Sequence, residues 1–130
     1  MNYHAVIWLD HRLAKIIGFN LRSSDWVAWD IHGHGDAHIH HKAGVVGAGH
    51  ETYDPVFFRA IADKISDFQE VLVVGPAETK KAFVTYLGHE RPAQALHVAG
   101  SEALDRRTNG ELADYARDFF KRADRMTPQL

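Results

Sequence analysis

The protein has 130 residues, of which 45% are hydrophobic and 25% are charged, as in one globular domain rather than two. Its formal net charge of −2 excludes a strongly basic nucleic-acid coat and an acidic disordered chain. The absence of cysteine excludes a disulfide scaffold, a thiolate zinc site and a cysteine nucleophile.

The first third of the chain predicts three strands. Residues 3–9 (YHAVIWL) are apolar on both alternating faces, which is typical of a strand covered on both sides of a sheet. Polar residues 10–12 follow and a second apolar run covers 13–19, so we expect an antiparallel hairpin. Apolar residues alternate again over 26–31, which predicts a third strand nearer the edge of the sheet.

The middle of the chain predicts two helices around a buried strand. Asp54 and Pro55 form an N-cap and N1 pair, and the apolar residues that follow at helical spacing predict a helix to about residue 67. The run EVLVVG at 70–75 is typical of a buried parallel strand. We expect the next helix to begin after Gly75-Pro76 and to end at Gly88 as its C′ residue.

The last third predicts a short strand and a long helix. Residues 95–99 are weakly strand-like. Thr108 and Glu111 have the spacing of a capping box, and the apolar face that follows predicts a C-terminal helix. Four basic residues near its end are interpreted as charges that complement the helix dipole: Arg117, Lys121, Arg122 and Arg125.

The order βββ, loop, αβαβα predicts a single mixed α/β sheet of about five strands with helices on both faces. In this sheet Val71–Val74 should run parallel to Tyr3–Leu9. We expect one domain over residues 1–126 with a long loop at 32–50, and a short tail at 127–130. No signal segment and no apolar stretch of about 20 residues is present, so we predict a cytoplasmic protein without a membrane partner.

Histidine is the compositional anomaly. Six of the ten histidines lie within residues 32–50, together with five glycines, and this segment has neither helical nor strand periodicity. Loops of this length inside compact domains are usually functional or mobile. The clustered histidines are His32, His34, His38, His40, His41 and His50.

Four local strings in this order resemble a known family. They are VIWLDHRLAKIIGF at 6–19, HHKAG at 40–44, VLVVGPAETKKAF at 71–83 and RTNGELADYA at 107–116. Together they resemble the middle domain of eukaryotic and archaeal class-1 release factors and of the ribosome-rescue factor Pelota. They are more similar still to small stand-alone bacterial release-factor-like proteins of the translation machinery. The resemblance covers nearly the whole chain and implies a ribonuclease-H-like, release-factor middle-domain-like fold.

The chain departs from the family at the catalytic loop. Release factors carry a Gly-Gly-Gln tripeptide there, whereas residues 38–50 read HIHHKAGVVGAGH and contain no Gln. Pelota also lacks the tripeptide and does not hydrolyse peptidyl-tRNA. The resemblance therefore implies a non-enzymatic, translation-linked protein that associates with the ribosome or RNA, although fold analogy alone does not establish a function.

The loop supplies the candidate binding residues. Glycine-rich backbone exposes amides that can hold phosphate, and lysine and protonated histidines add positive charge. The loop is not a Walker motif, because His50-Glu51 stands where Lys-Ser/Thr is required. The predicted RNA- or anion-binding residues are His40, His41, Lys42, Gly44, Gly47, Gly49 and His50.

Alternatives to this hypothesis stay open at the level of sequence. The loop could be a solvated surface segment, or its imidazoles could bind a metal such as zinc, although we expect no resident cofactor. A third candidate is an uncharacterised hydrolase, but no nucleophile elbow is present, and Asp10-His11 lies in a hairpin turn where adjacent side chains point apart. Trp26 on the outer strand predicts a subunit interface and a homodimer.

Overall fold

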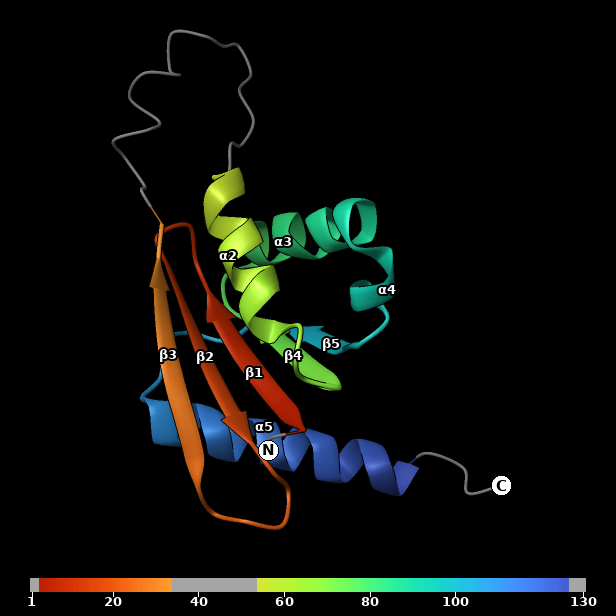
Figure 1. The fold of residues 1–130 in the computed structure, drawn as a ribbon. Coiled ribbons are helices and arrows are strands. Elements are labelled where there is room, and N and C mark those ends of the chain that lie inside the picture. The colour runs from red at the N-terminus through yellow and green to blue at the C-terminus, as the bar shows by residue number, and fades with distance from the viewer. Residues whose placement is uncertain (1–2, 34–53, 127–130) are drawn as a thin grey trace, which may run out of the picture.

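The computed structural model describes residues 3–33 and 54–126, which form one five-stranded sheet in the order β3-β2-β1-β4-β5 (Figure 1). β1 pairs antiparallel with β2 and parallel with β4, so the predicted hairpin and the predicted parallel neighbour are both confirmed. The strands are β1 His4–Leu9, β2 Leu13–Phe19, β3 Trp26–His32, β4 Glu70–Val74 and β5 Val98–Glu102.

Helices cover both faces of this sheet, as predicted (Figure 1). α2 and α3 pack on one face, and α5 packs on the other face. The side chain of Asp54 accepts hydrogen bonds from the backbone N–H groups of Val56 and Phe57, so the predicted N-cap is confirmed. The helices are α2 Pro55–Ile65, α3 Ala77–Glu90, the short α4 Pro92–Ala95 and α5 Asn109–Met126.

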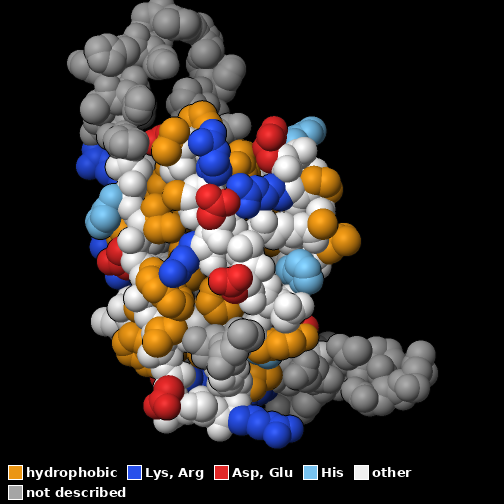
Figure 2. All heavy atoms as spheres, viewed as in Figure 1, with side chains coloured by type: hydrophobic (Ala, Val, Ile, Leu, Met, Phe, Trp, Pro, Cys, Tyr) orange, Lys and Arg blue, Asp and Glu red, His pale blue; other side chains and the backbone are white. Residues whose placement is uncertain are grey.

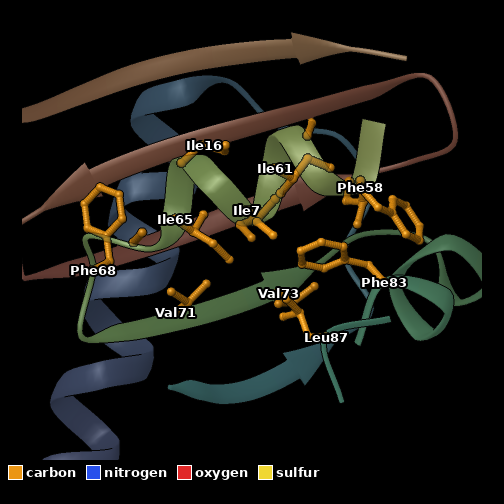
Figure 3. Close-up of a cluster of buried hydrophobic side chains, with 14 of the residues drawn as sticks. Ile7, Ile16, Phe58, Ile61, Ile65, Phe68, Val71, Val73, Phe83 and Leu87 are labelled. Atoms are coloured by element: carbon orange, nitrogen blue, oxygen red, sulfur yellow. The ribbon is translucent and has the colours of Figure 1, made fainter. Parts of the chain in front are cut away.

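Successive side chains of β1 point to opposite faces of the sheet, so the strand contributes to two hydrophobic cores. Ala5, Ile7 and Leu9 face α2 and α3, whereas Val6 and Trp8 face α5. Every residue of β1 is buried, as expected for the strand at the centre of the sheet. Figure 3 shows the first core, in which α2 lies across the sheet: its labelled side chains are Ile7, Ile16, Phe58, Ile61, Ile65, Phe68, Val71, Val73, Phe83 and Leu87.

The predicted end of α3 at Gly88 is wrong, because the helix continues to Glu90. Gly88 does not have positive φ, which a C′ glycine requires; among the described residues only Gly75 does. Arg91 leaves the helical region with φ −143° and ψ 64°, because it precedes Pro92 and a residue before proline is disfavoured in that region. The proline, not the glycine, therefore ends the helix.

The strand predicted at 95–99 is displaced toward the C-terminus. α4 occupies residues 92–95, and β5 begins at Val98 and pairs with β4 through Glu102. Pro92 favours the first turn of a helix at this point, and β5 is only half buried, so its hydrophobic pattern is weak. The strand exists as predicted, but its boundaries were wrong.

The interpretation of Arg117 as a solvated dipole charge is also wrong. Arg117 is buried, its Nη2 donates to the backbone oxygen of Asp25 at 2.7 Å, and its guanidinium lies 5.3 Å from the centre of the Phe19 ring. Its Nη1 lies 3.6 Å from the carboxylate of Asp114. Arg117 therefore ties α5 to the segment before β3, which places it in the structure rather than at a binding surface.

α5 begins with the predicted capping box. The backbone N–H of Thr108 donates to Glu111 Oε1 at 2.9 Å, and the backbone N–H of Glu111 donates to Thr108 Oγ1 at 3.2 Å. The hydrogen bond from the Thr108 backbone N–H, with a further contribution from the Thr108 side chain, favours the carboxylate and holds the pKa of Glu111 below its ordinary value.

We expect this carboxylate to make stability pH-dependent at the acid end. A lowered pKa gives a stabilisation that is complete above the unfolded-state pKa and is lost as pH falls through the folded-state pKa. Glu111→Gln, which keeps the amide hydrogen bond but loses the charge, should therefore be less stable than the wild type at pH 7. Urea unfolding should show this difference shrinking toward pH 3, and a difference that stays constant would contradict the role of the charge.

Candidate functional site

Four of the five strands end at the same edge of the sheet, and the segments that follow these strands begin there. β1, β3, β4 and β5 run in the same direction, since β1 and β3 are both antiparallel to β2, and β1, β4 and β5 are mutually parallel. Their C-terminal ends therefore lie at one end of the sheet, which we call the carboxyl edge (Figure 1). Ligands of open α/β sheets bind at this edge, because the loops that vary between proteins leave from it.

The predicted loop is flanked by two residues of the carboxyl edge. Gly33 donates its backbone N–H to the carbonyl of Arg12 at 2.8 Å, and Asp54 caps α2. A Cβ at Gly33 would lie 3.2 Å from the ring of Phe57, so the end of β3 and the first turn of α2 are in close contact. The predicted binding residues themselves, His40, His41, Lys42, Gly44, Gly47, Gly49 and His50, lie outside the described residues.

The hairpin turn at the carboxyl edge uses the carboxylate of Asp10 to hold its own backbone. Asp10 Oδ1 accepts hydrogen bonds of 2.8 Å from the backbone N–H groups of both Arg12 and Leu13. Asp10 is therefore a turn residue in this structure.

The turn from β4 to α3 brings three strand ends together. Gly75 has φ +132°, a conformation that residues with a side chain rarely adopt. Its N–H donates to the carbonyl of Glu102 at 3.3 Å, and a Cβ here would lie 2.4 Å from the carbonyl oxygen of Leu9. The ends of β1, β4 and β5 can approach this closely only because residue 75 is glycine.

Lys80 is a residue of this edge that the sequence analysis missed. It lies in the first turn of α3 and is only 7% exposed, whereas its neighbour Lys81 is exposed. Its position is three residues before Phe83 and seven before Leu87, so it lies on the helix stripe that packs against the sheet. The apolar pattern that predicts α3 starts at Phe83, and a lysine one turn earlier gives no apolar signal.

The segment after β5 is fixed on the other face of the sheet. Trp8 Nε1 donates to the carbonyl oxygen of Leu104 at 3.0 Å, and the guanidinium of Arg106 lies 5.7 Å from the centre of the Trp8 ring. The hydroxyl of Tyr115 donates to the carboxylate of Glu102, and this bond raises the pKa of the tyrosine. Arg106 is thus held as an exposed cation near the end of β1.

A metal site needs several ligating side chains that lie close together in the structure. Within residues 3–33 and 54–126, no group of three or more His, Asp or Glu side chains is placed to hold a metal ion. Zinc binding by the loop histidines stays a prediction, because all but His32 of that cluster lie outside these ranges. None of the described helices is long and apolar enough to cross a membrane.

Charge on the face covered by α2 and α3 is mixed. Figure 2 shows Lys and Arg side chains interspersed there with acidic, histidine and hydrophobic side chains. On the outer strand, Trp26 and Val27 remain 39% and 44% exposed. These two residues are compatible with the predicted homodimer, which stays a prediction.

Known structures with a similar fold include two archaeal proteins. No family model matches the sequence, and no curated protein is similar to it in sequence. Pelota from Archaeoglobus fulgidus is similar in structure, with a TM-score of 0.59 and 13% identity over 95% of this chain and 35% of that chain. An archaeal translation termination factor has a TM-score of 0.52 and 12% identity over 93% of this chain and 39% of that chain.

These similarities confirm the predicted resemblance at the level of the fold. The agreement covers almost all of this chain, as the four sequence strings suggested, but this chain spans little more than a third of the length of those proteins. Its fold therefore matches one part of each of those longer chains, as a single domain would.

Proposed function

We propose that this chain is a translation-linked protein that associates with the ribosome or RNA. The observation that supports it best is the fold, which is similar over 95% of the chain to part of Pelota and over 93% to part of an archaeal translation termination factor. Because identity is only 12–13%, the role comes to this chain as a proposal and not as an inherited property.

We propose that the contact is made by the loop residues His40, His41, Lys42, Gly44, Gly47, Gly49 and His50. Two observations favour this choice. The described residues that flank the loop, Gly33 and Asp54, both belong to the carboxyl edge, where α/β sheets bind their ligands. The exposed cations Arg12 and Arg106 lie at the same edge and would add attraction for phosphate.

The proposed role is non-enzymatic. The sequence has no Gly-Gly-Gln tripeptide, and the carboxylate of Asp10 is engaged by its own turn. We therefore predict that the protein lacks peptidyl-tRNA hydrolase activity.

Sedimentation with purified ribosomes tests the proposal. The wild type should co-sediment at low salt and be released as salt rises, since cations that bind phosphate displace counterions. Lys42→Ala should weaken the association and reduce the slope of log affinity against log salt by about one unit for the lost phosphate contact. Lys81→Ala, which removes the same charge from the exposed side of α3, is the matched control and should leave the slope unchanged.

Two outcomes would contradict the proposal. Failure of the wild type to co-sediment at any salt concentration would remove the ribosome as partner, and an affinity independent of Lys42 would remove the loop. The zinc alternative is separated by pH, because protonation of the histidines between about pH 7.5 and 6 strengthens RNA binding but weakens metal binding.

A further inference from the structure

The first turn of α3 differs from those of the other long helices of the described chain. Asp54 caps α2, and the pair Thr108 and Glu111 caps α5. α3 follows Pro76 and has no side-chain hydrogen bond at its N-cap. Its first N–H groups lack partners within the helix, and together with the helix dipole they favour an anion.

Lys80 is the second, independent observation at this place. More than nine-tenths of the residue is buried, yet its side chain makes no hydrogen bond or ion pair in the described part of the chain. Lysine is almost never buried to this degree without a partner. Its burial is that of the aliphatic stem, because the ammonium nitrogen is not among the fully enclosed unpartnered atoms.

The direction of the side chain follows from helix geometry. The Cα–Cβ bonds of an α-helix tilt toward its N-terminus, so a long side chain covers the turn before its own Cα. The backbone N–H of Lys80 donates to the carbonyl of Pro76, which places Lys80 one turn into α3. The ammonium is thereby directed toward the uncapped first turn.

A cation at this position is unfavourable by itself, because the positive end of the helix dipole repels the ammonium of Lys80. A bound anion would offset this repulsion, since it would accept from the ammonium and from the free backbone N–H groups. The exposed carboxylate of Glu78 in the same turn would oppose a bound anion and limit its affinity.

We infer that the first turn of α3, residues 77–80, is a phosphate-binding site in which Lys80 supplies the charge and the helix N-terminus supplies the hydrogen-bond donors. The ligand chemistry is a tetrahedral phosphate group, either free or part of an RNA backbone. The glycine turn at residue 75 sets the start of the helix directly above the ends of β1 and β4, at the carboxyl edge. The site consists only of residues 77–80 and does not depend on the segment at 34–53.

The test uses the whole protein and inorganic phosphate, followed by backbone amide NMR shifts. Phosphate should shift the amides of residues 77–80 in the wild type and in Lys81→Met. Lys80→Met keeps the buried stem but lacks the charge, and it should bind phosphate at least about tenfold more weakly, as expected for loss of a charged hydrogen bond. Equal binding by Lys80→Met and Lys81→Met would overturn the proposal, as would no shift at these amides.

A second variant keeps the proposal testable if Lys80→Met does not fold. Glu78→Gln removes an exposed carboxylate from the same turn and should strengthen phosphate binding about twofold. Unchanged or weaker binding by this variant would count against the site.

A short RNA in place of inorganic phosphate then distinguishes the two sources. Shifts of the same amides at a lower ligand concentration support a backbone phosphate, whereas shifts with inorganic phosphate alone support a free one. Because no ribosome is present, the result is independent of the sedimentation experiment.

Discussion

Gly75→Ala should destabilise the protein by about 3 kcal/mol or more. The backbone at this position has φ +132°, which an alanine adopts only with strain, and the new Cβ would lie 2.4 Å from the carbonyl oxygen of Leu9. That oxygen belongs to the backbone of the central strand and cannot move away as a flexible side chain could. The midpoint of urea unfolding, measured together with the slope, gives the change in stability.

Gly88→Ala is the matched control for this substitution. Gly88 lies inside α3, and a Cβ there would have no heavy atom within 4 Å. Alanine is about 1 kcal/mol more favourable than glycine in a helix interior, so this variant should be more stable than the wild type. Destabilisation of both variants to the same extent would show that the strain at Gly75 is not the cause.

The strands were predictable because burial leaves a simple pattern. β1 and β4 are covered on both faces, so every position is apolar, and both their existence and their parallel pairing followed from that. Local signals also identified two helix starts, since Asp54 and Thr108 cap helices through atoms within three residues of themselves. The features predicted correctly are those that depend on residues close in sequence, such as the helix caps, or on burial along a whole strand.

The errors have a different physical origin. Gly88 predicts a helix end because glycine is common there, but the conformation is decided by Pro92 four residues later. The sequence analysis interprets Arg117 as a solvated charge and does not single out Lys80, yet both are buried, because long side chains can pack their stems against the core. When a distant element of the fold buries a cation, the local sequence shows no pattern for it. The burial of these two residues could therefore be seen only in the structure.

Of the candidate site, the sequence could name the loop residues but not the cations of the carboxyl edge. The sequence singled out the histidine- and glycine-rich segment, and the structure places the flanking residues Gly33 and Asp54 at the carboxyl edge. The carboxyl edge adds three cations to the loop, and they come from segments far apart in the sequence: Arg12, Lys80 and Arg106. Their common place at the carboxyl edge depends on the strand order, which a search for linear motifs does not reveal.

The position of the α3 first turn depends on how α2 and α3 pack against each other. Phe58 of α2 is almost fully buried and packs edge-on against the rings of Phe83 and Tyr86 of α3, with ring centres 5.2 and 5.5 Å apart. Figure 3 shows the rings of Phe58 and Phe83 side by side. Edge-on aromatic pairs add stabilisation beyond the area that they bury. Phe58 is therefore one of the side chains that hold α2 against α3 above the sheet.

Phe58→Ala should destabilise the protein by about 4 kcal/mol, since it removes a buried ring and leaves a cavity that the sheet and two helices cannot close. Phe58→Leu retains most of the volume and should cost less than half as much. Val56→Ala is the control in the same helix: Val56 is 53% exposed, so its loss should change stability by no more than about 0.5 kcal/mol. Urea unfolding at one pH gives all three values. If Phe58→Ala lost no more stability than Val56→Ala, the aromatic contact between α2 and α3 would not be what fixes the first turn of α3 at the carboxyl edge.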